Sequence, residues 1–94
     1  MGDLPTVELL EQTHQFPGPY MFKVIGRVDD GFTARVVAAV REVLEWDEDP
    51  PFHVRHAAGG RHVAVTVEPT LQTAQQVLTI YQRLRGLRGL VMFL

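Results

Sequence analysis

The chain has 94 residues, of which 46% are apolar and 21% are charged, and its formal net charge is −2. This length supports one domain, and the near balance of charge argues against a nucleic-acid-binding protein. Because the sequence contains no cysteine, serine or asparagine, it excludes disulfides, thiolate chemistry and acyl transfer by a serine nucleophile.

Residues 1–19 are interrupted by proline and glycine, so we expect a partly mobile N-terminal arm followed by a single domain over residues 20–94. The segment "VELLEQT" within the arm can form one or two helical turns. No basic stretch precedes a long apolar run, and no segment is long enough to cross a bilayer. We therefore expect a cytoplasmic protein that does not bind membranes.

The segment "YMFKVIGR" (residues 20–27) predicts a first strand that is apolar on both faces. In a strand, successive side chains point to opposite faces. A chain of 94 residues usually covers only one face of a sheet, so the second face needs another explanation. The two alternating sets are Tyr20, Phe22 and Val24 on one face, and Met21, Lys23 and Ile25 on the other.

Helical periodicity follows from residue 32, where Phe32, Val36, Val40 and Val43 form one apolar stripe. Asp29 or Asp30 is the expected N-cap, because a carboxylate accepts hydrogen bonds from the free amides of the first turn. The acidic segment "DEDPP" ends this helix.

The segments "FHVRH" and "RHVAVTVE" predict a hairpin in which Val54 lies opposite Val65, with a four-residue turn at 58–61. A second helix follows, with Thr70 as its expected cap and Gly86 as its end. The final segment "LVMFL" predicts a last strand.

The element order βαββαβ indicates an α+β, ferredoxin-like sandwich. We expect a four-stranded antiparallel sheet, with its strands in the order 4-1-3-2 and two helices on one face. The first and third strands are placed at the centre and are expected to run parallel to each other.

Several segments resemble a known family of small bacterial proteins, the YbeD-like family. The resemblance rests on "ELLE" (8–11), "FPGPYMFKVIG" (16–26), "VVAAV" (36–40), the stretch from "VTVEPT" to "IYQRL" (65–84) and "VMFL" (91–94). It implies a ferredoxin-like fold similar to that of ACT regulatory domains, which bind amino acids and control metabolic enzymes.

The resemblance also suggests a ligand site in the loop between the first strand and the first helix, because ACT domains bind ligands there. Free amides at a helix N-terminus attract a carboxylate or phosphate, and aspartates can meet a ligand's ammonium group. The alternative is a capped helix start with no ligand. The candidate ligand-binding residues are Gly26, Arg27, Asp29, Asp30, Gly31 and Phe32.

The uncovered face of the sheet is a candidate docking surface, for a protein partner or for a second copy in a homodimer. The last strand favours pairing because "LVMFL" has no charge, no proline and no bulge signal. The alternative is that arm residues 12–19 cover this face. The candidate partner-binding residues are Met21, Lys23, Ile25, Arg55, His62, Ala64 and Thr66.

No metal site or cofactor is expected. His53, His62 and Glu68 share the uncovered face, but a zinc site needs three or four converging ligands. The arginines at 83, 85 and 88 suit the carbonyl end of the second helix, and a small anion or RNA patch is the alternative.

These patterns favour a non-enzymatic regulatory or interaction module that binds a protein partner or a small metabolite. An acylphosphatase-like enzyme is the first alternative, but the chain lacks the asparagine that would hold the attacking water. An RNA-binding module is the second, but the strand at 61–68 has no aromatic residue on which a base could stack. We therefore expect no nucleic-acid partner.

Overall fold

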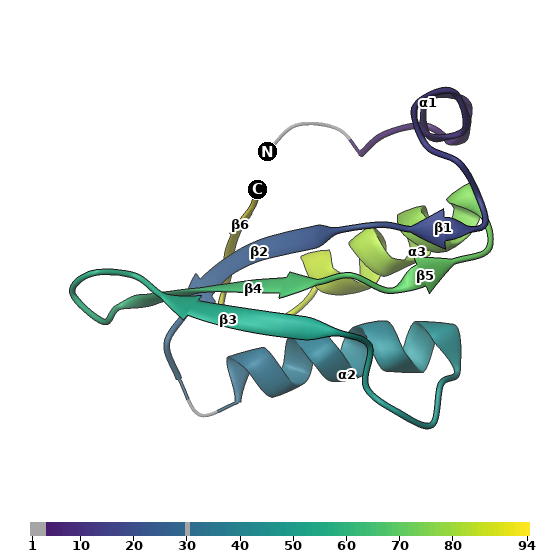
Figure 1. Ribbon diagram of the computed structural model, residues 1–94. Coiled ribbons are helices and arrows are strands. Elements are labelled where there is room, and N and C mark those ends of the chain that lie inside the picture. Colours follow the sequence, from purple (N-terminus) through teal and green to yellow (C-terminus); the bar gives the residue numbers. More distant parts are fainter. Residues whose placement is uncertain (1–3, 30) are drawn as a thin grey trace.

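Four antiparallel strands form a sheet that carries two helices on one face, as Figure 1 shows for the computed structural model. The structure describes residues 4–29 and 31–94. The predicted α+β, ferredoxin-like fold is confirmed. The elements in chain order are α1 (Val7–Thr13), β1 (Gly18–Pro19), β2 (Phe22–Arg27), α2 (Phe32–Leu44), β3 (Phe52–His56), β4 (His62–Val67), β5 (Thr70–Leu71), α3 (Ala74–Arg85) and β6 (Leu90–Phe93).

The strands of the main sheet lie in the order β3-β4-β2-β6, which confirms the predicted order. The prediction that the two central strands run parallel is wrong, because β2 and β4 pair antiparallel. The physical reason lies in the connections. Helix α2 returns the chain so that β3 runs in the direction of β2, and the tight hairpin then reverses β4.

The hairpin has the predicted register, with Val54 opposite Val65. The Ala57 N–H donates to the carbonyl oxygen of His62 over 3.0 Å, and this bond leaves the expected four-residue turn at 58–61. This register directs Val54 and Val65 toward the helices.

The core lies between the sheet and the helices. On β2 and β4 the side chains alternate between the two faces: Phe22, Val24, Val65 and Val67 are fully buried on one face, while Lys23 is exposed on the opposite face. Alternation of this kind fixes the register, because a shift by one residue would exchange the two faces. The helices supply the other half of the core, with Phe32, Val36, Val37, Ala39 and Val40 from α2 and Ala74, Val77, Ile80 and Leu84 from α3.

Helix α3 begins later than predicted, since Thr73 rather than Thr70 is its N-cap. The Thr73 hydroxyl accepts from the Gln76 N–H, and the Gln76 side chain accepts from the Thr73 N–H, which together form a capping box. Thr70 instead pairs with Pro19 in the small sheet of β1 and β5. The predicted end at Gly86 is confirmed.

The N-terminal arm folds against the end of the molecule where α3 begins (Figure 1). Thr6 caps α1, Leu10 is buried, and β1 pairs with β5. Residues 12–19 therefore do not lie over the uncovered sheet face.

Next to the arm, the Tyr20 and Tyr81 hydroxyls lie 3.2 Å apart. Burial together with this contact raises the pKa of Tyr81.

Across residues 4–29 and 31–94, no helix has both the length and the apolar character needed to cross a membrane.

Candidate functional site

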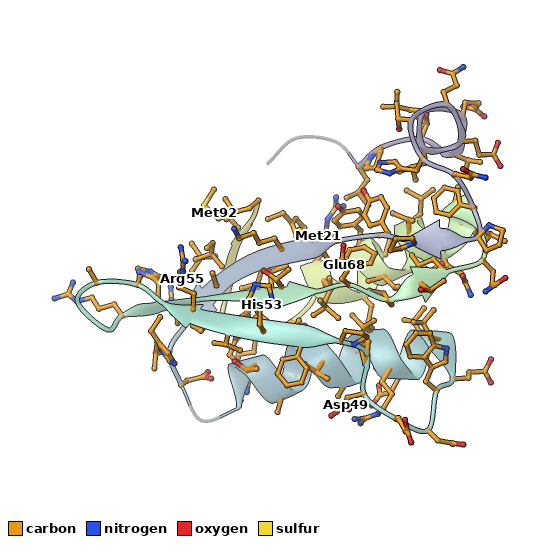
Figure 2. The ribbon with its side chains drawn as sticks, in the orientation of Figure 1. Met21, Asp49, His53, Arg55, Glu68 and Met92 are labelled. Atoms are coloured by element: carbon orange, nitrogen blue, oxygen red, sulfur yellow. The ribbon has the colours of Figure 1, made fainter. Side chains whose placement is uncertain are left out.

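The face of the sheet opposite the helices carries a continuous surface that no described element covers, hereafter the open face. Figure 2 shows His53, Arg55 and Met92 on the strands and Met21 and Glu68 next to strand ends, all away from helix α2. All seven residues predicted to bind a partner lie on this face. Each occupies a strand position, or a position next to a strand, whose side chain points away from the core. Their role in binding stays a prediction.

One side of the open face is apolar. Ile25 lies opposite Met92, and the Leu94 N–H donates to the carbonyl oxygen of Lys23 over 2.8 Å. Met21, Met92 and Leu94 are 53%, 47% and 63% exposed. Large apolar side chains that gather on one exposed surface are typical of interaction sites. The residues Met92 and Leu94 were not among the predicted site residues, although strand alternation in "LVMFL" would have identified them.

The other side of the open face is polar and mainly basic. Lys23, Thr66 and His53 lie side by side on three neighbouring strands. Arg55 follows on β3, and Arg27 lies opposite His62. Thr66 is only 5% exposed, so its neighbours cover it and it offers little to a partner. Glu68 is the acidic residue that borders this surface, and Lys23, Arg27 and Arg55 outnumber it.

The pairing of the edge strand β6 with β2 is irregular. Its register with β2 shifts between Ile25 and Gly26, because Ile25 pairs with Met92 and Gly26 pairs with Leu90. This irregularity leaves Val91 without a partner of its own. The sequence "LVMFL" carries no bulge signal, so this irregularity could not be read from it. A bulge twists an edge strand and weakens it as a template for a second copy.

The loop before α2 is held by Asp29. Its carboxylate accepts the Phe32 N–H over 3.0 Å and the Arg35 guanidinium over 2.8 Å. The hydrogen bond and the charge of Arg35 lower the pKa of Asp29 from its ordinary value. The prediction that Asp29 or Asp30 is the N-cap is wrong, because Gly31 holds that position with a φ of 110°. The Asp29 carboxylate still accepts a hydrogen bond from an amide of the first turn, as the prediction expected of a capping carboxylate. Asp30 lies outside the described residues.

Residues on both sides of the loop, Gly26 in β2 and Arg35 in α2, contribute to packing. A Cβ atom on Gly26 would lie 2.2 Å from the Phe32 ring, so glycine is required for this ring to sit beneath β2. The Arg35 guanidinium also donates to the carbonyl oxygen of Arg88 over 3.0 Å, which ties the loop to the start of β6. Gly26, Asp29 and Phe32 therefore have structural roles, and ligand binding by the six loop residues stays a prediction.

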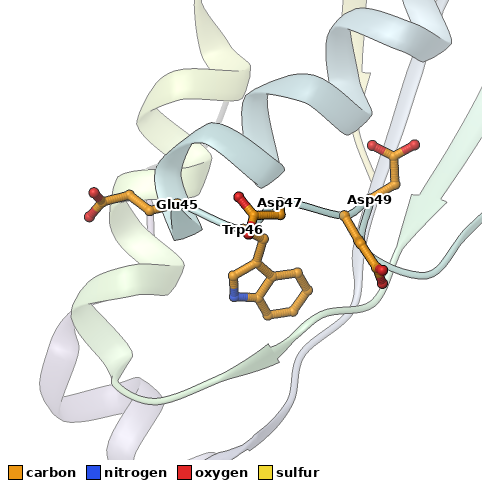
Figure 3. A pocket seen from close by; sticks show the side chains of 5 residues that line it. Glu45, Trp46, Asp47 and Asp49 are labelled. Carbon is orange, nitrogen blue, oxygen red and sulfur yellow. The ribbon is translucent and has the colours of Figure 1, made fainter.

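The candidate metal ligands and the candidate anion-binding arginines do not form a site. Among the described residues, no three histidine or acidic side chains are placed to hold a metal ion. Arg83 forms an ion pair with Glu42, which links α3 to α2. Figure 3 shows a pocket after α2 that is lined by Trp46 and by the acidic residues next to it in the chain.

The sequence is similar to small bacterial proteins. A family model described as "Protein of unknown function (DUF493)" matches residues 11–94. The UPF0250 protein of Shewanella sp. strain ANA-3 is 30% identical over 79 residues, which cover 84% of this chain and 88% of that protein. The UPF0250 protein of Shewanella frigidimarina is also 30% identical, over the same shares of both chains.

The fold is similar to the solution structure of protein HP0495 from H. pylori. The TM-score is 0.65, the identity is 15%, and the match covers 100% of this chain and 98% of the other. This likeness supports the fold alone. The sequence matches confirm the resemblance to the YbeD-like family, and the chain belongs to the bacterial family of unknown function DUF493 (UPF0250).

Proposed function

We propose that this chain is a non-enzymatic interaction module whose open face binds an acidic surface of a partner protein. The observation that carries the proposal is the apolar group Met21, Ile25, Met92 and Leu94 beside the basic side chains of the same face. Burying such apolar side chains stabilises a complex. The basic side chains of the open face orient the partner and raise the rate of association.

The charge of the open face favours a different protein over a second copy. Two copies stacked face to face would bring Lys23 and Arg55 toward the same basic set on the other chain. Among the described residues of this face, Glu68 is the acidic side chain that would offset this repulsion. A partner with acidic side chains around an apolar centre has no such cost, because like charges disfavour and opposite charges favour the contact.

Site-specific photo-crosslinking in the native host tests this proposal. A crosslinker at position 92 is compared with one at Gln75, an exposed residue of α3. We expect one protein to be captured from position 92 and not from position 75. The purified partner should then bind the purified chain, more weakly as salt is raised, since the interaction includes charge.

Two substitutions complete the test. Met92→Asp and Lys23→Glu should each weaken binding of the purified partner at least about tenfold, which corresponds to about 1.4 kcal/mol. Gln75→Glu is the matched control and should leave binding unchanged. Crosslinks only to a second copy, or binding that survives both open-face substitutions, would contradict the proposal.

A small-metabolite role at the loop is the competing proposal, supported by the position of the loop at the N-terminal end of α2 and by the resemblance to ACT domains. Titration of the labelled chain with amino acids distinguishes the two. We expect no amide shifts at residues 26–32, because the Asp29 carboxylate already engages the Phe32 N–H and Arg35. Saturable shifts confined to this loop would favour the regulatory role instead.

A further inference from the structure

A second surface lies along the opposite edge of the sheet, between strand β3 and helix α2. A groove of about 580 Å³ lies there. Phe52 borders the groove and is 45% exposed. Figure 1 shows α2 running beneath β3 along this edge. The groove is lined by Gly31, Thr33, Ala34, Val37, Ala38, Arg41, Asp49 and Phe52.

The backbone of β3 offers hydrogen bonds toward this groove. Within the described chain, β3 pairs only with β4, so one of its edges is free. The Glu68 N–H donates to the Pro51 carbonyl over 2.9 Å, and the Ala57 N–H donates to the His62 carbonyl over 3.0 Å. Bonds alternate along an antiparallel ladder, so the intervening Phe52, Val54 and His56 direct their N–H and C=O groups outward.

The side chains around this edge define what would fit. Ala34 and Ala38 are small, so an added chain can approach α2 closely, and Phe52 and Val37 supply apolar contact. On the other face of β3, His53 and Arg55 are exposed. An added strand would therefore place alternate side chains against the apolar groove and the others beside these basic groups.

We propose that β3 and α2 bind an extended peptide segment of alternating apolar and acidic residues, which adds to the sheet as a fifth strand. Main-chain bonds to Phe52, Val54 and His56 provide affinity in this mode, and side-chain contacts provide specificity. The segment is as long as β3, which has 5 residues.

A second copy of the chain fits this edge poorly. If two β3 strands paired about a two-fold axis at Val54, His53 of each chain would lie beside Arg55 of the other. If β6 of one chain entered the groove of the next, the contact would be head-to-tail and would build rings or open filaments rather than a two-fold dimer. The edge therefore favours a peptide from a different protein, with acidic side chains.

Nuclear magnetic resonance with synthetic peptides tests this inference. The probe is an acetylated, amidated heptapeptide of alternating glutamate and valine, in which three valines can lie opposite Phe52, Val54 and His56. We expect saturable amide shifts at 31–41 and 52–56, and slower amide exchange at those three β3 residues. No binding at millimolar peptide, or shifts confined to the open face, would overturn the inference.

Two N-methylated peptides isolate the backbone bonds. In an antiparallel addition, the valine amides face β3 and the glutamate amides face away; in a parallel addition this is reversed. One peptide is methylated at its valine amides and the other at its glutamate amides. Methylation of the amides that face β3 should lower the affinity at least about tenfold, while methylation of the other set should leave it unchanged. Equal binding of both methylated peptides would overturn strand addition.

Variants of the chain isolate the side-chain contacts. Ala34→Glu places a charge in the groove and should abolish binding, whereas Gln75→Glu on α3 should not alter it. Arg55→Glu should reverse the preference toward a heptapeptide of alternating lysine and valine. Far-ultraviolet circular dichroism verifies that each variant folds. Unchanged binding in Ala34→Glu, or self-association of the free chain through β3 in sedimentation experiments, would contradict the inference.

Discussion

The two faces of the main sheet are built by the same strands, yet they have opposite environments. Phe22 is buried beneath the helices, while Met21, its neighbour in sequence, is half exposed on the open face. Both are large apolar residues. The difference shows that hydrophobicity alone does not place a residue in the core; the position of the helices does.

The contrast also separates stability from binding. The covered face contains interlocking residues of β2, β4, α2 and α3, and their burial stabilises the fold. The open face contains side chains whose removal leaves no cavity. We therefore expect substitutions on the covered face to lower the free energy of unfolding, and substitutions on the open face to affect partner binding.

The largest expected effect comes from removing a core ring. Phe22→Ala should lower the free energy of unfolding by about 3–5 kcal/mol, because it removes a fully buried ring and leaves a cavity. Met21→Ala is the matched change on the open face and should alter stability by less than about 0.5 kcal/mol. Urea unfolding measures both values, and similar losses would show that the two faces do not differ as described.

A smaller effect is expected where β2 touches α2. Gly26→Ala should destabilise the fold by about 1–3 kcal/mol, since the new methyl group would collide with the Phe32 ring at 2.2 Å. Gly86→Ala is the control, because its nearest neighbour lies at 3.8 Å and its φ is −86°. That variant should be as stable as the parent or more stable, and a comparable loss in thermal unfolding would refute the packing argument.

The capping of α3 tests the corrected helix start. Thr73→Ala should lower the free energy of unfolding by about 1 kcal/mol, because it removes the acceptor for the Gln76 N–H. Thr70→Ala should cost less, since Thr70 is exposed and caps no helix. If urea unfolding shows the larger loss in Thr70→Ala, the helix begins where the sequence pattern placed it.

The smallest effect concerns the loop that connects the sheet to α2. The pKa of Asp29 is lowered in the folded chain, so its ionised form adds stability above its ordinary pKa of 3.8. That stability is lost as the pH falls through the lowered value. Arg35→Gln should raise the pKa of Asp29 toward 3.8 in a carboxyl titration by nuclear magnetic resonance. Arg41→Gln should leave it unchanged, and the reverse pattern would contradict the assignment.

Most of the fold could be predicted because local patterns and the tertiary arrangement agree. Alternation over 20–27 and 61–68 gave the strands and their core faces, and the position of Val54 opposite Val65 followed from matching those faces. The start of α3 could not be found in the same way. Thr70 and Thr73 are both good caps, and the choice depended on Thr70 pairing with Pro19, which is 51 residues away in the chain.

The same distinction between local patterns and distant contacts applies to the candidate binding surfaces. The sequence by itself predicted that the first strand has apolar residues on both faces and that two helices would cover one of them, and it left open whether the arm covers the other. Only the tertiary structure decided where the arm lies, that β6 carries a bulge, and that α2 and β3 form a groove. These features depend on contacts between residues far apart in sequence, and such contacts leave no periodic signal in the chain.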